Sequence, residues 1–138
     1  PCHGAVHNFK PLEDADIADG LAPWQGLSPS PLFEGPRRYT PKEMDRDDIK
    51  AVLDSWVEAT RRSEDAGYDF LEIHGAHGYL IHQFLSPQAN KRNDEYGGSD
   101  LNRMRFAIEV VQSARAHWPD NKPPFLRLAV SDLSPKHT

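Results

Sequence analysis

Residues 68–106 read YDFLEIHGAHGYLIHQFLSPQANKRNDEYGGSDLNRMRF, and the predicted fold follows from this stretch. It opens with a short apolar run and then becomes rich in polar side chains, with His74, His77, Tyr79 and His82 inside nine positions. An Asn-, Asp- and Gly-rich loop comes next, and then a helix start. Parallel α/β proteins build active sites where strands end in such loops. The stretch therefore predicts an α/β protein with a site directly after this strand.

The overall composition is typical of one domain with a modest core. The chain has 138 residues, of which 38% are hydrophobic, and a net charge of -5 from 16 Lys+Arg against 21 Asp+Glu. This balance favours neither nucleic acid nor an anionic membrane as a partner, and no apolar run approaches the roughly 18 residues of a membrane span. The single cysteine, Cys2, fits a reducing compartment, so a cytoplasmic location is predicted. The first residue is Pro rather than Met, which suggests processing or an incomplete chain.

Residues 1–44 are predicted to form an extended segment that lies on a larger body. Prolines recur there too closely for a helix or a central strand. Trp24, Phe33 and Tyr39 are the residues expected to pin this segment down. So long a structureless stretch is unusual in a compact domain, and we place the domain boundary between residues 44 and 45.

A helix, a glycine stop and a strand are predicted next. The helix runs from about Asp45 to Ala66, because apolar residues recur at helical spacing and aspartates crowd its start. Gly67 is a natural left-handed stop. Tyr68 to His74 is predicted to be a strand that is buried and parallel, since most of its residues are apolar.

The second half repeats this order. One or two helical turns are predicted for Tyr79 to Leu85, and Ser99 is a good N-cap for a second long helix. Phe125 to Val130 is predicted to be a second strand. The buried stripe of the second helix is predicted to be Leu101, Met104, Ile108, Val111 and Trp118. Two strands do not make a stable parallel sheet, so the chain is expected to be a piece of something larger or to associate.

The polar residues after the first strand suggest chemistry on a carbonyl compound. Two imidazoles can donate hydrogen bonds to one oxygen and polarise it, and a tyrosine two residues beyond His77 can donate a proton in the same pocket. A hydride source would also be needed, and that means a cofactor. Two alternatives stay open: histidines without any chemistry, and a metal site that adds His82, although no cysteine or suitably spaced carboxylate supports the latter.

Arg127 is the other unusual residue, because it lies inside an apolar strand. A charge in a buried strand needs a partner. The partner is either a carboxylate in a structural ion pair or the anionic edge of a cofactor.

The run GYDFLEIHGAHGYLIHQFLSPQANKRNDEYGGSDLNRMRF closely resembles the Old Yellow Enzyme family of FMN-dependent oxidoreductases. The likeness continues to FLRLAVSD and extends back, more weakly, through AGYD to APWQGLSPS. It covers roughly residues 21–132, and residues 1–20 are not placed by it. The resemblance implies a partial (β/α)8 TIM barrel over residues 45–138, with Tyr68–His74 similar to the fourth strand and Phe125–Val130 to the fifth.

The resemblance also implies a role for each candidate residue. His74 and His77 resemble the pair that binds the substrate oxygen, although many relatives have Asn at the second place. Tyr79 resembles the catalytic proton donor, and Arg127 resembles the cofactor-binding arginine beside the pyrimidine edge of FMN. Four residues of the loop and the following helix are expected to be structural: Arg92, Asp94, Arg103 and Arg105.

The implied activity is reduction of the C=C bond of an α,β-unsaturated carbonyl compound, with NADPH or NADH reducing FMN. An enone or a phenolic ligand is the implied small-molecule partner, and no metal is implied. The family's other flavin-holding residues would precede Pro1 or follow Thr138, so about a third of a barrel is expected. The alternative is a non-catalytic truncated fragment that self-associates through open strand edges.

Overall fold

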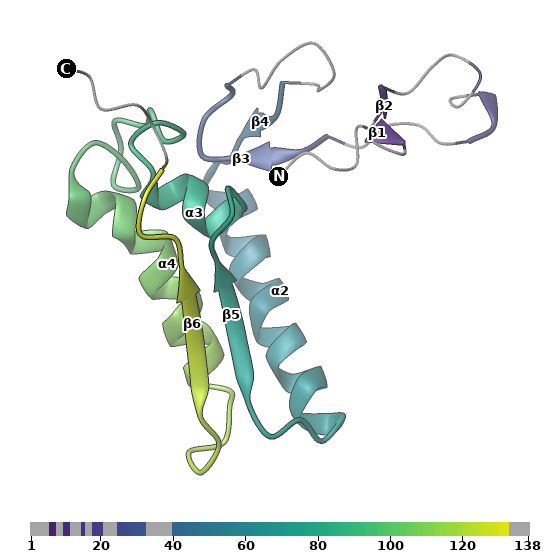
Figure 1. Ribbon diagram of the computed structural model, residues 1–138, viewed down its shortest axis with the longest axis vertical. Coiled ribbons are helices and arrows are strands. Elements are labelled where there is room, and N and C mark those ends of the chain that lie inside the picture. The colour runs from purple at the N-terminus through teal and green to yellow at the C-terminus, as the bar shows by residue number, and fades with distance from the viewer. Residues whose placement is uncertain are drawn as a thin grey trace.

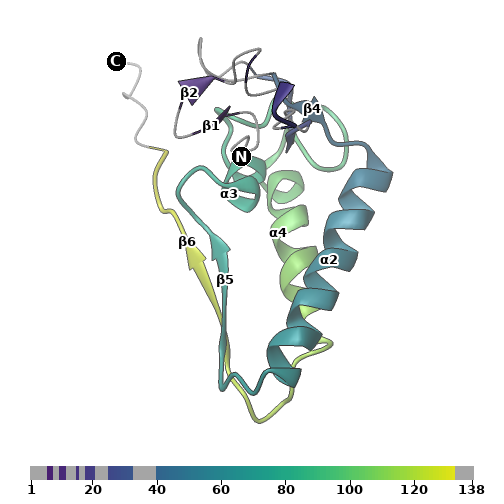
Figure 2. The same ribbon diagram turned by 90° about the vertical axis from the view of Figure 1, so that its right-hand side faces the viewer.

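The computed structural model describes residues 6–7, 10–11, 15, 18–20, 25–32 and 40–132. Its centre is a parallel pair of strands, β5 (Leu71–Gly75) and β6 (Pro124–Leu128). The helices α2 (Arg46–Asp65), α3 (Leu80–Leu85) and α4 (Asp100–Arg115) belong to the same body. The two long helices lie on one side of the strand pair (Figures 1 and 2). The predicted α/β class with parallel strands is confirmed.

α2 begins and ends where the sequence predicts. Asp45 is the N-cap, and its side chain accepts a hydrogen bond from the backbone N–H of Asp48. In return, the N–H of Asp45 donates to the carboxylate of Asp48. This reciprocal capping satisfies two backbone donors that a helix start leaves without partners. At the other end Gly67 has φ +82°, and the amides of Gly67 and Tyr68 donate to Glu64 and Ser63. That left-handed glycine turn ends the helix and directs the chain into β5.

α4 is capped by Ser99 as predicted, but its predicted buried stripe is largely wrong. Leu101, Met104 and Ile108 are 73%, 40% and 47% exposed, whereas Trp118 is buried as expected. The residues that α4 buries are Phe106, Ala107, Val110 and Ala114. The helix carries two apolar rows at helical spacing, and spacing alone does not show which row faces the core.

The core lies where the three helices meet β5. Phe84 of α3 stacks on Phe106 of α4 with ring centroids 4.3 Å apart, and both side chains are fully buried. The other buried members of this cluster come from every element around it: Met44, Ile49, Ile73, Ile81, Ala107, Val110 and Ala114. Packing of this kind fixes α3, and with it the segment that follows β5.

Both predicted strands are present, β5 as Leu71–Gly75 rather than Tyr68–His74 and β6 as Pro124–Leu128 rather than Phe125–Val130. Their predicted burial is only partly right. Ile73 is buried, whereas Phe70 is 58% exposed and Phe125, Leu126 and Leu128 are also exposed. Within the described residues, helices cover one face of the β5–β6 pair and leave the other face open (Figure 2). Arg127 lies on β6 and is exposed, so the premise of a charge buried in a strand is wrong.

The early segment contains short strands rather than none. β1 (Val6–His7) pairs with β2 (Lys10–Pro11), and β3 (Leu27–Ser28) pairs in parallel with β4 (Lys42–Glu43). Trp24, Phe33 and Tyr39 fall outside the described residues, so their predicted pinning role and the boundary after residue 44 stay predictions. Among the described residues, no helix is both long and apolar enough to cross a membrane.

Candidate functional site

Three aromatic side chains gather at the carboxyl end of β5. The ring centroids of His74 and His77 are 5.0 Å apart, and those of His74 and Tyr79 are 5.4 Å apart. His77 has φ +59° and Gly78 has φ +74°, so two consecutive left-handed residues bend the chain sharply between the end of β5 and α3. This bend brings His77 and Tyr79 back beside His74, as the sequence predicts.

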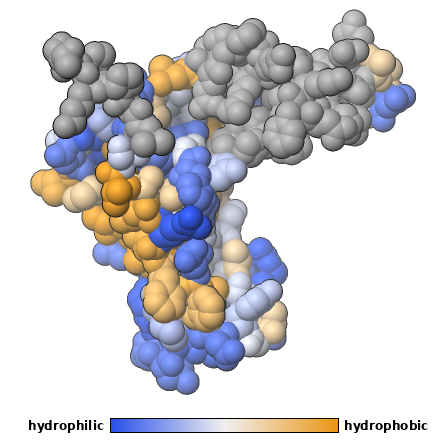
Figure 3. Space-filling view, in the orientation of Figure 1, coloured by the Kyte–Doolittle hydropathy of each residue, from blue (hydrophilic) through white to orange (hydrophobic). Residues whose placement is uncertain are grey.

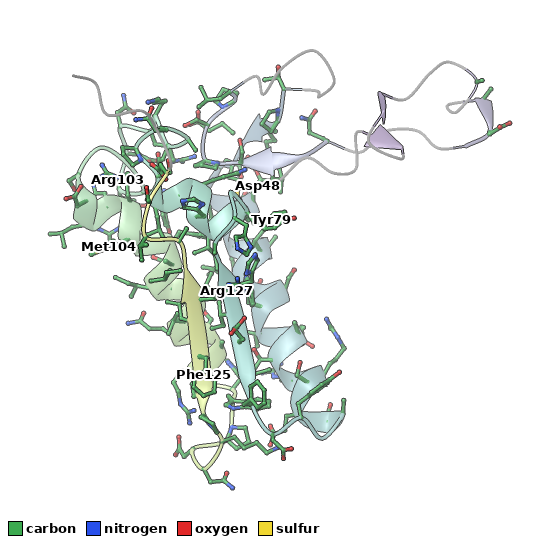
Figure 4. All side chains as sticks on the ribbon, viewed as in Figure 1. Asp48, Tyr79, Arg103, Met104, Phe125 and Arg127 are labelled. Atoms are coloured by element: carbon green, nitrogen blue, oxygen red, sulfur yellow. The ribbon has the colours of Figure 1, made fainter. Side chains whose placement is uncertain are left out.

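Arg127 joins this group from the neighbouring strand. Arg127 and His74 are register partners in the parallel β5–β6 pair, and Nη2 of Arg127 is 3.4 Å from Nε2 of His77. A guanidinium only donates, so His77 accepts this long hydrogen bond at Nε2. Figure 4 shows Tyr79 and Arg127 near each other at the upper end of the strands, with Phe125 lower on β6.

The site occupies the open face of the strand pair. Side chains alternate between the two faces of a strand, and Ile73 and Gly75 of β5 point to the helices, where Gly75 lies against Leu128 and Ile81. His74 and its register partner Arg127 therefore share the opposite face. Phe70 and Phe125 pack edge to face at 5.8 Å near the other end of the strands. The open face thus has Phe70 and Phe125 at one end and the polar group around His74 and Arg127 at the other end.

His82 does not join the other two histidines as a metal ligand. Its Nδ1 accepts a hydrogen bond of 2.8 Å from the backbone amide of Gly78, and its Nε2 lies 3.0 Å from Oδ1 of Asp132. Both ring nitrogens are therefore engaged with the protein itself. Across the described residues, no group of three or more His, Cys, Asp or Glu side chains is arranged to hold a metal ion.

Three residues near the site were missed by sequence reasoning. Gln83 donates to the carbonyl of Gly78 at 2.8 Å, and Ser86 donates to Oδ2 of Asp132 at 2.8 Å. Asp132 follows β6, and a polar residue just beyond a parallel strand is a usable signal for a site. Gln83 and Ser86 give no such signal, because their roles depend on which backbone groups the fold brings to them.

The loop before α4 is held by buried and half-buried arginines. Arg92 is 8% exposed and donates to the carbonyls of Pro29 and Met44 while it pairs with Asp94 at 2.6 Å. The Arg92 guanidinium holds the pKa of the Asp94 carboxyl below its usual range. These contacts agree with the predicted structural role of Arg92 and Asp94, since a guanidinium fork can satisfy several buried acceptors at once.

Arg103 and Arg105 make similar backbone contacts. Arg103 donates to the carbonyls of Leu85 and Gly98, and Arg105 donates to the carbonyl of Glu95. None of these three bonds involves His74, His77, Tyr79 or Arg127, so the two arginines also brace the loop as predicted.

The fold and the site together define a βα-repeat protein with its candidate site at the carboxyl ends of parallel strands. Residues 15–138 match the family described as the NADH:flavin oxidoreductase / NADH oxidase family. The chain belongs to this family, which is the Old Yellow Enzyme family that the sequence motif indicates.

Similar curated proteins carry the name NADPH dehydrogenase. The chain is 49% identical over 106 residues to the one from Clostridium acetobutylicum, covering 77% of this chain and 31% of that protein. It is 44% identical over 110 residues to the one from Geobacillus sp. (strain WCH70), covering 80% of this chain and 32% of that protein. The chain thus spans about a third of the length of these relatives.

Solved structures of reductases superpose on a similar share of this chain. Morphinone reductase superposes with a TM-score of 0.69 at 32% identity, over 76% of this chain and 32% of that chain. A 2-naphthoyl-CoA reductase superposes with a TM-score of 0.70 at 31% identity, over 74% of this chain and 16% of that chain. Another structure of morphinone reductase is a complex with tetrahydroNAD. The architecture of this chain is therefore part of the fold of these reductases.

Proposed function

We propose that this chain is the substrate-side part of an FMN-dependent NAD(P)H oxidoreductase that reduces the C=C bond of α,β-unsaturated carbonyl compounds. The observation that carries this proposal is the convergence of His74, His77 and Tyr79 beside Arg127 at the carboxyl ends of β5 and β6. In the proposed assignment β5 is the fourth strand of a (β/α)8 barrel and β6 is the fifth. Family membership and the resemblance to reductases of known structure support it.

His74 and His77 are the proposed substrate-binding pair. Two ring N–H groups aimed at one carbonyl or phenolate oxygen would stabilise the negative charge that develops there. In the present arrangement Nε2 of His77 accepts from Arg127. A neutral His77 then carries its proton on Nδ1, which leaves that atom as the donor for a ligand.

Tyr79 is the proposed proton donor. Its ring lies 5.4 Å from that of His74, centroid to centroid, so a substrate oxygen held by the histidines would bring the α-carbon within reach of the phenol. A general acid must lie within hydrogen-bond reach of the atom that it protonates.

Arg127 is the proposed contact for FMN. Its side chain is exposed on the open face of the strands, beside His77, and a fixed cation there suits the anionic edge of a flavin ring. When bound, the flavin supplies the hydride that the carbon skeleton accepts. The chain's own residues hold the substrate oxygen, supply the proton and place one positive charge.

A chimaera tests the reaction. Residues of the Clostridium acetobutylicum NADPH dehydrogenase that align with this chain are replaced by those of this chain, and cyclohexenone reduction with NADPH is measured. Tyr79→Phe is expected to lower the rate at least about 100-fold, the usual size of a general-acid effect. Tyr96→Phe is the matched control, since the Tyr96 hydroxyl bonds Glu109 instead. A full rate with Tyr79→Phe would refute the proton-donor role.

The substrate-binding pair has its own test in the same chimaera. Replacing His74 and His77 by Ala is expected to weaken the binding of a phenol, measured by titration of the flavin absorbance. Unchanged phenol affinity would show that the two histidines do not hold the substrate oxygen.

A second candidate is a non-catalytic fragment, and one specific observation favours it. Leu101, Met104, Ile108, Phe125, Leu126 and Leu128 are all exposed large apolar residues on one body. Isolated proteins rarely keep so much apolar surface in water. The 138-residue chain is mixed with FMN and desalted, its visible spectrum is recorded, and its mass is measured by light scattering. Retained flavin favours an assembled site, whereas colourless, associated protein favours the fragment.

A further inference from the structure

The backbone N–H and C=O of Gly78 are both held by consecutive side chains of α3. The N–H of Gly78 donates to Nδ1 of His82 at 2.8 Å, and the C=O of Gly78 accepts from Nε2 of Gln83 at 2.8 Å. Gly78 lies between His77 and Tyr79, and its φ is +74°. Two of the four residues of the candidate site, His77 and Tyr79, are therefore the direct chain neighbours of the clamped residue.

The conformation that this clamp holds is an unfavourable one. His77 has φ +59°, in the left-handed region where Cβ crowds the following carbonyl oxygen. A strained backbone of this kind persists when the surrounding structure fixes it, and such residues cluster at functional sites. The two hydrogen bonds to Gly78 are contacts that fix it, and both come from the first turn and a half of α3.

The clamp is connected to the strand that carries Arg127. Because Nδ1 of His82 accepts from Gly78, its proton lies on Nε2, which then donates to Oδ1 of Asp132 at 3.0 Å. Ser86 donates to Oδ2 of the same carboxylate. Asp132 lies four positions beyond the end of β6. The His82 side chain is 14% exposed and that of Asp132 is 22% exposed, so water competes only weakly for this bond.

From these contacts we infer that His82 and Gln83 are positioning residues, which clamp Gly78 and tie the β5 turn bearing His77 and Tyr79 to the end of β6. His82 acts through the backbone and through Asp132, and it does not itself touch the substrate. One consequence, that the clamp affects ligand affinity, rests on the proposed function. The clamp itself is a property of the fold.

Amide hydrogen exchange of the full 138-residue chain tests the clamp directly. His82→Leu removes the acceptor for Gly78 and is expected to speed exchange of the Gly78 amide roughly fivefold to tenfold, the effect of one lost hydrogen bond. His82→Asn is expected to restore protection, because Asn Oδ1 can stand where Nδ1 stood. His117→Leu is the matched control: its ring bonds the carbonyl of Ser113 near the far end of α4, and Gly78 should not respond.

Outcomes that overturn the clamp are equally specific. Unchanged Gly78 exchange in His82→Leu would overturn it, as would a failure of His82→Asn to restore protection. If His82→Leu also speeds exchange of the Val110 amide in the core, the whole chain is destabilised. His82→Gln is then the variant that tests the clamp. Glutamine can still reach Asp132 but not accept from Gly78, so faster Gly78 exchange with Val110 still protected supports the clamp, and unchanged Gly78 exchange overturns it.

Ligand binding then separates the clamp from the proposed function. In the flavin-bound chimaera, with 4-hydroxybenzaldehyde as the phenol probe, His82→Leu is expected to weaken binding about threefold to tenfold. His82→Asn should recover part of that loss, because it restores the contact with Gly78 but not the contact with Asp132. A chimaera that carries flavin but binds no phenol counts against the proposed function, while the exchange experiment on the 138-residue chain still decides the clamp. If His82→Leu leaves the phenol affinity unchanged, the positioning role is overturned.

Discussion

The two apolar faces of α4 are similar in composition and differ completely in their surroundings. One face packs Phe106 and Val110, both fully buried, against α2 and α3. The other presents Met104 and Ile108 to a groove of about 290 Å³, shared with Leu126 and Leu128 of β6. Figure 3 shows this second face as a continuous hydrophobic area over α4 and β6. A helix that is apolar on two sides is suited to neighbours on both.

Burial, and not residue type, therefore sets how much each apolar side chain of α4 contributes to the stability of the fold. Burying a large apolar side chain stabilises a fold by about 1.5–3 kcal/mol, and a side chain left half exposed supplies only part of that. The inner face of α4 should therefore hold this chain together. The outer face should instead determine how the chain associates with other molecules.

Phe106→Ala is expected to have the largest effect on stability. The side chain is fully buried and stacks on Phe84, so its removal should lower the free energy of unfolding by about 3–5 kcal/mol. Urea denaturation of the 138-residue chain measures this. Ile108→Ala on the outer face is the paired control and should cost under about 1 kcal/mol. Equal losses would mean that the outer face is covered in solution.

Arg92→Leu is expected to have the second-largest effect on the free energy of unfolding. It leaves the buried carbonyls of Pro29 and Met44 without their donor, and each unsatisfied buried acceptor costs about 1–3 kcal/mol. We expect a loss of roughly 2–4 kcal/mol in the same denaturation assay. Arg92→Lys should recover less than half, because one ammonium cannot replace the guanidinium fork.

Arg61→Ala is the control for that prediction. Arg61 pairs with Glu58 on the exposed surface of α2, and exposed ion pairs contribute about 0–1 kcal/mol. A loss at Arg61 as large as that at Arg92 would contradict the distinction between bracing and surface arginines.

Ile108→Glu should change association more than stability. A charge in the groove between α4 and β6 makes it costly to cover that face, so the mass measured by light scattering should fall toward that of a single chain. The urea midpoint should move little, since Ile108 is already 47% exposed. Unchanged association would show that the copies meet elsewhere, for instance along open strand edges.

The smallest expected effect is a change in the free energy of unfolding at alkaline pH. Burial, followed by the charge of Glu109, raises the pKa of Tyr96 to about 12. The unfolded chain ionises this phenol near pH 10, so the folded state binds the proton more tightly. The free energy of unfolding should therefore fall as pH rises from about 10 to 12. Tyr96→Phe should remove that part of the slope, and an identical slope would assign it to other groups.

Local chemistry was enough to predict where α2 begins and ends and where α4 begins. Asp45 and Ser99 are helix caps because their short side chains accept from backbone amides, and Gly67 ends α2 because it adopts positive φ without strain. The site at the end of β5 was predictable for a related reason. His74, His77 and Tyr79 are close in sequence, so one strand end and one turn are enough to gather them.

Contacts between distant residues were not predictable in the same way. Arg127 lies 50 positions from His77, and its pairing with His77 and its exposure both depend on the register of two strands. The clamp on Gly78 was also missed, because Gln83 and Asp132 acquire their roles from backbone groups and side chains that only folding brings to them.

The order of helices and strands from α2 to β6, the family and the residues of the proposed chemistry were all predictable from the sequence, because caps, periodicity and a long motif are local properties of the chain. The tertiary structure alone decided which apolar face of α4 is buried and which side chains hold the turn at Gly78. Those outcomes depend on long-range packing and hydrogen bonding, and residues with the same spacing and hydrophobicity can satisfy them in more than one way.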